Sequence, residues 1–264
     1  MTIIVAHPDT QHSVHAARGL RRAGLLEYLF TSFSLQRPAL LAAVLEALTP
    51  RYHLRLAQHR GHQDFGPDEL RVFPAHLVAT RLGRRWASVT RRAFARAAAR
   101  MAIRRQAGVM AFNSNATETF RLLEGRGLAC ILDQSIAHRR WRERVGAEEM
   151  AAFPGWERER DRRDPVSQVL ADEDEEVARA DLILCGSEFC AETMIQEGVD
   201  PRKVAIVEYG ADTDKFTPAL RARESREGVR LLFVGALVLR KGVPYLLEAV
   251  KQVSPCPFPR SAIL

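Results

Sequence analysis

Short apolar runs that alternate with helical segments constrain the fold of this chain most strongly. Seven runs predict strands, at residues 3–6, 28–33, 108–112, 128–133, 181–186, 204–209 and 230–235. Helices are predicted between them, among others at residues 13–23, 38–48 and 242–253. Continuous apolar strands separated by helices are typical of a parallel sheet that is covered on both faces. The sequence therefore predicts an α/β protein with a doubly wound parallel sheet.

The loops at the carboxyl ends of the strands are the expected ligand sites of such a sheet. The loops begin at His7, Asn113, Gln134, Ser187, Gly210 and Ala236. The first loop lacks the Gly-x-Gly-x-x-Gly pattern of a dinucleotide site, so a nicotinamide enzyme is not expected. His7, His12 and His15 lie close together in sequence, but no nearby acidic residue or cysteine supports a metal site. We therefore expect neither a metal nor a cofactor.

The charge and the absence of targeting signals narrow the class of protein. The 264 residues carry a formal net charge of +7, which favours anionic partners such as nucleotide phosphates or an anionic membrane. No apolar run reaches the roughly 18–20 residues that cross a bilayer, and the first residues lack the features of a secretory signal. The four cysteines have no metal-binding spacing, as in cytosolic proteins. We expect a cytoplasmic protein that can also bind the inner face of the membrane.

A polar, charged stretch at residues 215–229 divides the chain into two parts. One predicted strand and one predicted helix follow it, and three prolines then interrupt regular structure. A lone strand and helix bury too little apolar surface to form a domain. The sequence thus predicts a Rossmann-like domain at residues 1–218, followed at 219–264 by a linker and the start of an incomplete second domain.

Two segments in the second half carry a resemblance to a known family. They read VEYGADTDKFTP and LLFVGALVLRKGVPYLLEAV, and a charged spacer separates them. In this order they resemble the interdomain region of family 4 glycosyltransferases of the GT-B fold. The preceding ADLILCGSEFCAETMIQEGVDPRKVAIV is similar to the last strand–helix–strand unit of that family's N-terminal, acceptor-side domain. The resemblance implies transfer of a sugar from a nucleotide-diphosphate sugar to an acceptor hydroxyl, with retention of the anomeric configuration.

The resemblance also implies a donor diphosphate site at Gly235, Arg240 and Lys241. A cation before a helix start can stabilise a departing diphosphate, by on the order of 3–4 kcal/mol for one well-placed donor. The alternative is a solvated basic loop. Many family members carry arginine where this chain has Ala236, and the family's Glu-x7-Glu element would lie beyond residue 264. We therefore expect a truncated enzyme, or alternatively a non-catalytic glycan- or membrane-binding fragment.

Candidate acceptor-side residues follow two central strands. Relatives often place a histidine after the strand that ends here in LDQSIAHRRW, so the resemblance implies that His138 positions a substrate or assists proton transfer. Asn113, Ser114 and Asp133 are candidates for polar contacts with a glycan, lipid-linked or small-molecule acceptor. The alternatives are that His138 is an ordinary polar loop residue, and that Ser114 or Asn115 caps the next helix.

An arginine-rich stretch without acidic residues occupies positions 70–117. Arg92, Arg96, Arg100 and Arg104 form a row at helical spacing. The sequence places an apolar stripe beside this row, formed by Trp86, Val89, Phe94, Ala97 and Met101. Such a helix can bind an anionic membrane, or it can be a solvated outer helix. Nucleic acid is not an expected partner, because aromatic interleaving and known nucleic-acid motifs are missing.

Acidic residues are expected near two helix starts. The run at residues 172–176 is predicted to lie near the start of a helix on a solvated face, where negative charge suits the helix dipole. Glu188 is predicted to open another helix directly after Ser187. Both assignments are structural, and neither implies a metal.

Overall fold

The computed structural model describes residues 1–9, 12–32, 64–76, 84–156, 166–211, 213, 216–218 and 231–253. The chain divides into two compact units. Unit 1 comprises residues 1–137 and 166–208, and unit 2 comprises residues 138–165 and 209–264. The helix predicted at 38–48 and almost all of the linker predicted at 215–229 lie outside the described residues. The domain boundary at residue 218 stays a prediction.

Unit 1 is built on a sheet of seven parallel strands. They are β1 (Ile3–Ala6), β2 (Leu26–Thr31), β3 (Leu70–Val72), β4 (Gly108–Phe112), β5 (Cys130–Gln134), β6 (Leu182–Cys185) and β7 (Val204–Ile206). Their order is β3-β2-β1-β4-β5-β6-β7, and each neighbouring pair is parallel. This confirms the predicted doubly wound α/β fold. The direction of winding reverses between β1 and β4, which is the topological switch point.

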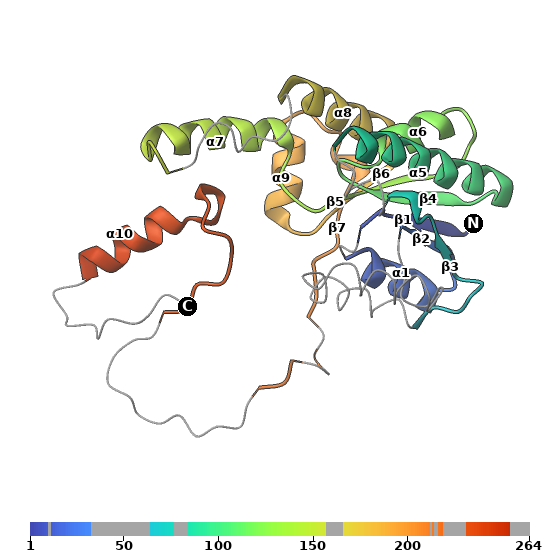
Figure 1. Ribbon diagram of the computed structural model, residues 1–264, viewed down its shortest axis with the longest axis horizontal. Coiled ribbons are helices and arrows are strands. Elements are labelled where there is room, and N and C mark those ends of the chain that lie inside the picture. Colours follow the sequence, from blue (N-terminus) through green and yellow to red (C-terminus); the bar gives the residue numbers. More distant parts are fainter. Residues whose placement is uncertain are drawn as a thin grey trace. The chain divides into compact units, whose positions relative to one another are not determined.

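Helices cover both faces of this sheet (Figure 1). On one face lies α1 (Ser13–Arg22), and on the other lie α5 (Arg84–Arg105), α6 (Thr117–Leu123), α8 (Val166–Arg179) and α9 (Glu188–Gln196). Strand β1 shows why both faces are apolar. Ile3 and Val5 pack on the α1 side, whereas Ile4 packs on the α5 side, as the two-residue period of a strand requires. The sequence of a strand that is buried on both faces is therefore one continuous apolar run.

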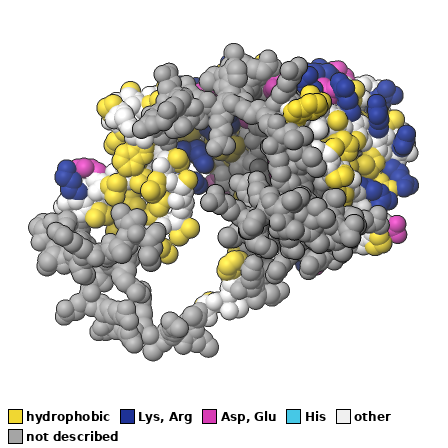
Figure 2. All heavy atoms as spheres, viewed as in Figure 1, with side chains coloured by type: hydrophobic (Ala, Val, Ile, Leu, Met, Phe, Trp, Pro, Cys, Tyr) yellow, Lys and Arg dark blue, Asp and Glu magenta, His cyan; other side chains and the backbone are white. Residues whose placement is uncertain are grey.

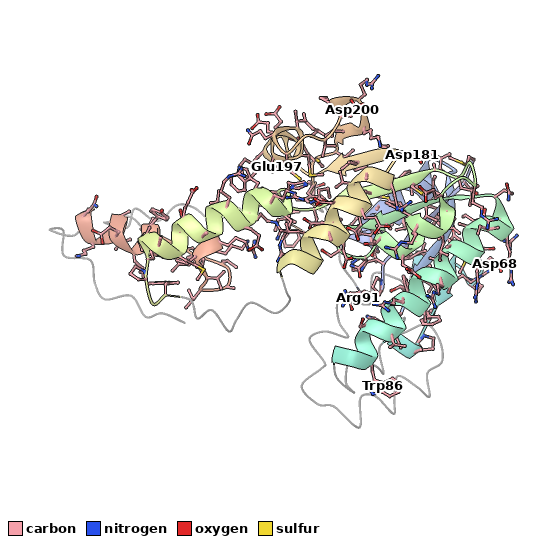
Figure 3. All side chains as sticks on the ribbon, turned by 90° about the horizontal axis from the view of Figure 1, so that it is seen from above. Asp68, Trp86, Arg91, Asp181, Glu197 and Asp200 are labelled. Atoms are coloured by element: carbon pink, nitrogen blue, oxygen red, sulfur yellow. The ribbon has the colours of Figure 1, made fainter. Side chains whose placement is uncertain are left out.

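The apolar stripe predicted for α5 is correct only in its carboxyl-terminal part. Phe94 is buried and stacks on Phe30, with ring centroids 4.3 Å apart, but Trp86 and Val89 are 57% and 55% exposed. With 22 residues, α5 is roughly 33 Å long, whereas a five-residue strand spans about 17 Å. The first turns of α5 therefore extend past the sheet, and Figure 3 shows Trp86 at this end of the helix. Small residues such as Ala98 make the close contact with the sheet.

Unit 2 contains α7 (Arg139–Ala152), the short 3-10 helix η5 (Leu239–Lys241) and α10 (Val243–Val253). The helix predicted at 242–253 is confirmed as α10. Tyr245 joins it to α7, because its hydroxyl donates to Glu149 Oε1 at 2.9 Å and its ring lies edge-on to Phe153 at 4.9 Å. The strand predicted at 230–235 is wrong, since the described residues 231–235 form none and Leu232 is 88% exposed. A strand needs a partner strand, and the described part of unit 2 contains no strand.

The acidic run at residues 172–176 also differs from its prediction. Helix α8 begins at Val166, so the run lies beyond its first turn. Glu173 and Glu176 are buried, so the run is not a solvated face. Glu176 can be buried because its carboxylate accepts hydrogen bonds from backbone amides of the loop before α6. The prediction for Glu188 holds, because it begins α9 directly after Ser187, whose side chain accepts from the Cys190 amide.

Candidate active site at the carboxyl edge of the sheet

The switch point places the side chains of several strands side by side on the α1 face. Ala6 of β1 pairs with Ala111 of β4, so His7 lies level with Phe112, and Phe112 in turn pairs with Asp133 of β5. The ring centroids of His7 and Phe112 are 4.9 Å apart. The carboxyl edge of the sheet therefore presents a row that runs from β1 to β5.

His12 joins this row from the start of α1. Its Nε2 lies 2.9 Å from Asp133 Oδ1, and its ring centroid lies 5.2 Å from that of Phe112. The side chain of Asp133 is 9% exposed and that of His12 is 26% exposed. His12 of the first loop therefore has an acidic partner, although this single contact does not make a metal site. The partner is 121 positions away in sequence, so no local spacing could reveal it.

A histidine held by a carboxylate has a defined chemistry. The carboxylate fixes the orientation of the imidazole and stabilises its protonated form, so that the ring can exchange a proton with a hydroxyl. The pair of His12 and Asp133 is reachable from solvent through His12. This makes the pair the best candidate for chemistry in unit 1.

Buried polar atoms without partners flank this pair. His7 is 1% exposed, and its Nδ1 lies 2.6 Å from the Asp9 carbonyl oxygen and 2.9 Å from the Asp9 amide nitrogen. Neither His7 Nε2 nor Thr31 Oγ1 has a hydrogen-bond partner among the residues described. Burial lowers the pKa of His7, although Asp9 and Asp133 act in the opposite direction. The edge therefore contains a buried imidazole nitrogen and a hydroxyl whose hydrogen-bonding capacity water or a ligand can satisfy.

The predicted acceptor-side residues lie at neighbouring strand ends. The Asn113 amide donates to the Asp133 carbonyl at 3.0 Å, and Asn113 Oδ1 accepts from Ser135 Oγ at 2.7 Å. Ser114 has a positive φ of 68°, and its amide donates to Glu176 Oε2 at 2.8 Å. Asn113 and Ser114 thus follow β4, and Asp133 lies near the end of the adjacent strand β5. Their contact with an acceptor stays a prediction.

Glu176 holds the loop after β4 in place. Its Oε1 accepts from the amides of Ala116 and Thr117, at 2.7 and 3.1 Å, and from Thr117 Oγ1 at 3.0 Å. The expectation that Ser114 or Asn115 caps α6 is wrong. The cap residue is Ala116, and the carboxylate that accepts from the first amides of α6 is that of Glu176 in α8. Burial raises the pKa of Glu176 to about 7, while these hydrogen bonds lower it.

His138 begins α7 in unit 2. Its Nδ1 accepts a hydrogen bond from the Arg140 amide at 3.2 Å, and the side chain is buried. Capping a helix is a structural role, which is in line with the alternative that His138 has no part in catalysis. Its proposed catalytic role stays a prediction.

The predicted diphosphate residues come together around η5. A Cβ atom built on Gly235 would lie 4.0 Å from Lys241 Cδ, and Arg240 and Lys241 are both exposed. The amides of Lys241 and Gly242 already donate to carbonyls within this turn, and Pro244 has no amide hydrogen. The start of α10 therefore offers fewer amide donors than a regular helix start, so the two cations carry most of the predicted site.

The arginine row lies on the outer surface of α5. Arg92, Arg96, Arg100 and Arg104 are all exposed, and Arg96 Nε lies 3.0 Å from Glu118 Oε1. Figure 2 shows Lys and Arg side chains gathered over α5 and α6. Within the part of the chain that the structure describes, no helix is long and apolar enough to cross a bilayer.

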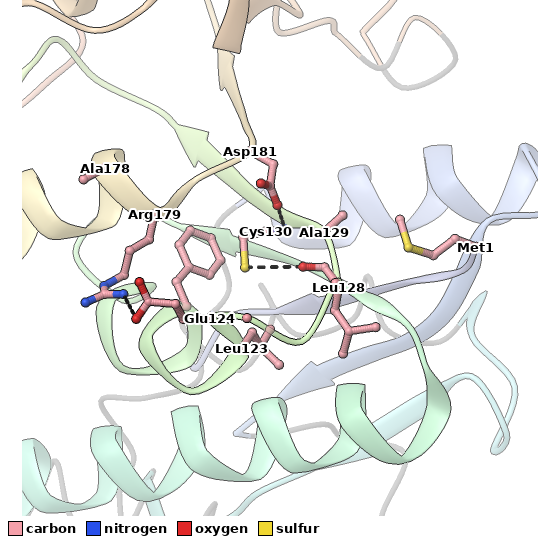
Figure 4. Close-up of a pocket in the computed structure, with 12 residues that line it drawn as sticks. Met1, Leu123, Glu124, Leu128, Ala129, Cys130, Ala178, Arg179 and Asp181 are labelled. Carbon is pink, nitrogen blue, oxygen red and sulfur yellow. Dashed lines mark hydrogen bonds and ion pairs between the residues drawn. The ribbon is translucent and has the colours of Figure 1, made fainter.

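A cavity of about 540 Å³ lies at the opposite, amino-terminal edge of the sheet (Figure 4). Phe120 and Leu128 form part of its apolar lining, and Arg179 pairs with Glu124 at its rim. Burial raises the pKa of the Cys130 thiol to about 12, so this thiol is a poor nucleophile. The cavity is remote from the switch point, where topology directs ligands, and we assign it no role.

The fold and this edge define a Rossmann-like α/β protein with a histidine–carboxylate pair at its switch point. A stretch of 100 residues is 34% identical to a protein named D-inositol 3-phosphate glycosyltransferase from Geodermatophilus obscurus. The match covers 35% of this chain and 22% of the relative, so the chain matches about a fifth of that protein's length. No protein-family model matches the chain, and no solved structure gives a significant match. Part of the chain is therefore similar to a glycosyltransferase.

Among the described residues, no cluster of three or more His, Cys, Asp or Glu side chains is suited to hold a metal ion.

Proposed function

We propose that this chain is the acceptor-side part of a glycosyltransferase, which transfers a sugar from a nucleotide-diphosphate sugar to an acceptor hydroxyl. The observation that carries the proposal is the 34% identity to a glycosyltransferase over 100 residues. The polar carboxyl edge of the parallel sheet supports it, because this edge is where such a fold binds substrates.

The two units have different roles in this proposal. In unit 1, Asn113, Ser114 and Asp133 contribute to the acceptor site. In unit 2, Arg240 and Lys241, with Gly235 beside them, bind the donor diphosphate and stabilise its developing charge. The resemblance to family 4 adds retention of the anomeric configuration, which NMR of the anomeric proton of the product tests.

The acceptor that fits best is a phosphorylated polyol. The name of the partial relative contains D-inositol 3-phosphate, a cyclitol that offers hydroxyls and one phosphate. The net charge of +7 attracts such an anion, and the unpartnered polar atoms of His7 and Thr31 suit hydroxyl groups. D-inositol 3-phosphate is therefore the first acceptor to test.

A second candidate function is binding of a glycan or an anionic membrane without catalysis. The exposed row of Arg92, Arg96, Arg100 and Arg104 favours the membrane part of this candidate. Trp86 and Val89 are exposed on the same helix and can enter a lipid interface. The same surface serves an enzyme whose acceptor is linked to lipid.

A transfer assay separates the two functions. The full chain is incubated with D-inositol 3-phosphate and a panel of UDP-, GDP-, ADP- and dTDP-sugars, and mass spectrometry follows the acceptor. A new product one sugar heavier, together with free nucleoside diphosphate, supports the proposed enzyme. Acceptor binding in calorimetry without transfer supports the non-catalytic alternative. The absence of both acceptor binding and transfer contradicts the glycosyltransferase proposal.

A further inference from the structure

We infer that Glu176 of α8 is a positioning residue for the acceptor, because it fixes the shape of the loop after β4 that offers Asn113 and Ser114 to the substrate. This inference rests on the proposed function, since it concerns the same acceptor site. Glu176 does not itself touch the substrate and acts through the loop. It lies 60 positions from Ala116, so no local motif indicates this role.

The hydrogen bonds of the Glu176 side chain carry the inference. Oε2 accepts from the Ser114 amide at 2.8 Å, while Oε1 accepts from the amides of Ala116 and Thr117 at 2.7 and 3.1 Å. One carboxyl group therefore bonds three of the four backbone amides between residues 114 and 117. Its two oxygens have different tasks, because Oε1 holds the start of α6 and Oε2 holds the loop before it.

The backbone at Ser114 needs this support. Its φ of 68° lies in the left-handed region, which residues other than glycine occupy only where their surroundings hold them there. The Ser114 side chain is exposed, whereas Glu176 is completely buried. Glu176 is thus an internal support, and Ser114 is the residue that a substrate can reach.

The same loop is also held from β5. The Asn113 amide donates to the Asp133 carbonyl at 3.0 Å, and Asn113 Oδ1 accepts from Ser135 Oγ at 2.7 Å. The loop is therefore fixed to β5 at Asn113 and to α8 at Ser114. Loss of the α8 contact changes the position of Ser114 relative to Asn113 and leaves the β5 contacts in place.

Glu176→Gln separates positioning from a purely structural cap. The single carbonyl oxygen of Gln can still accept from Ala116 and Thr117, as Oε1 of Glu176 does. The NH₂ group of Gln then faces the Ser114 amide, and two donors cannot bond to each other. The variant thus keeps the cap of α6 and releases Ser114 selectively.

Glu175→Gln is the matched control on the same helix. Glu175 also joins α8 to α6, because its Oε2 lies 2.6 Å from Nη2 of Arg121. A role that only fastens these two helices together is weakened in both variants. A positioning role is lost in Glu176→Gln alone.

The experiment combines NMR and calorimetry on the full chain at pH 8, above the pKa of about 7 that burial gives Glu176. In Glu176→Gln, solvent exchange of the Ser114 amide should become roughly 10-fold faster or more, while the amides of Ala116 and Thr117 stay protected. The affinity for D-inositol 3-phosphate should fall roughly 10-fold. In the transfer assay the KM for this acceptor should rise by a similar factor, and the KM for the sugar donor should not change. Glu175→Gln should keep the wild-type acceptor affinity and the wild-type exchange of Ser114.

The outcomes separate this inference from the proposed function. Wild-type acceptor affinity in a Glu176→Gln chain whose Ser114 amide is released overturns the positioning role and leaves the glycosyltransferase proposal intact. A Ser114 amide that stays protected in Glu176→Gln overturns the inference as well. The same is true if both variants lower kcat equally and change neither KM. A wild-type chain that neither binds the acceptor nor transfers a sugar contradicts the proposed function, and the inference with it.

Discussion

The buried carboxylate of Glu176 should make the stability of unit 1 depend on pH. Burial raises its pKa from 4.5 to about 7. The folded state therefore binds this proton more tightly than the unfolded state, and the contribution to stability is full below pH 4.5 and is lost as the pH rises through 7. A shift of about 2.5 pKa units at 1.36 kcal/mol each corresponds to about 3 kcal/mol.

His7 acts in the opposite direction over part of the same range. Burial lowers its pKa from 6.5, so its contribution is present above pH 6.5 and is lost as the pH falls through the folded-state pKa. The pH dependence of the wild-type protein is therefore a sum of opposing effects. The difference between the wild type and Glu176→Gln, which keeps the shape of the neutral carboxyl, isolates the effect of Glu176.

The assay is urea unfolding followed by circular dichroism between pH 4.5 and 8. The free energy of unfolding of Glu176→Gln relative to the wild type should rise by about 3 kcal/mol over this range. Glu175→Gln is the matched control on the same helix, because ion pairs with Arg121 and Arg179 lower the pKa of Glu175 and move its titration below the range. Parallel curves for the wild type and Glu176→Gln would refute the reasoning.

Three further predictions concern the donor site, the membrane surface and the core. Lys241→Ala should weaken UDP binding roughly 10- to 100-fold in calorimetry, because it removes a charge-assisted contact. Lys251→Ala, on α10, is the control and should leave the affinity for UDP unchanged. Equal UDP affinities of Lys241→Ala and the wild type would contradict the diphosphate site. Replacing all four arginines of the row with Glu should abolish sedimentation with anionic liposomes; they are Arg92, Arg96, Arg100 and Arg104. Sedimentation with neutral liposomes is the control and should not change. If sedimentation with anionic liposomes is unaltered, the arginine row is not a membrane-binding surface. Leu132→Ala, at a fully buried position in β5, should lower the free energy of unfolding by about 2–5 kcal/mol, and a loss below about 1 kcal/mol would contradict the described core.

The parallel sheet could be predicted because burial on both faces makes each central strand continuously apolar. The observed bounds of β1 and β4 agree with the predicted ranges for this reason. β3 has no counterpart among the predicted strands, because three residues at the sheet edge show no comparable apolar pattern. The run at 230–235 has the composition of a buried strand, but the described part of unit 2 provides no strand to pair with it. Composition predicts a strand only where the fold supplies its partner.

The site was only partly predictable from sequence. Asn113 and Asp133 could be named because polar residues directly after apolar strands meet at the carboxyl edge of a parallel sheet. The pairing of His12 with Asp133 depends on a sheet order that the sequence does not state, and it joins positions 121 apart. The cap that Glu176 supplies to α6 is likewise a contact between distant segments. A search for polar residues at the ends of strands predicted to flank the switch point could have suggested His12.

The most direct test of the account is to locate the bound acceptor by NMR. On titration of the full chain with D-inositol 3-phosphate, backbone amide shifts are expected at the carboxyl edge, in residues 7, 9, 12–13, 113–115 and 133–135. The account predicts saturable changes there and weaker binding in Asp133→Asn. Changes confined to the cavity at the amino-terminal edge, around residues 123–130 and 178–181, would contradict it.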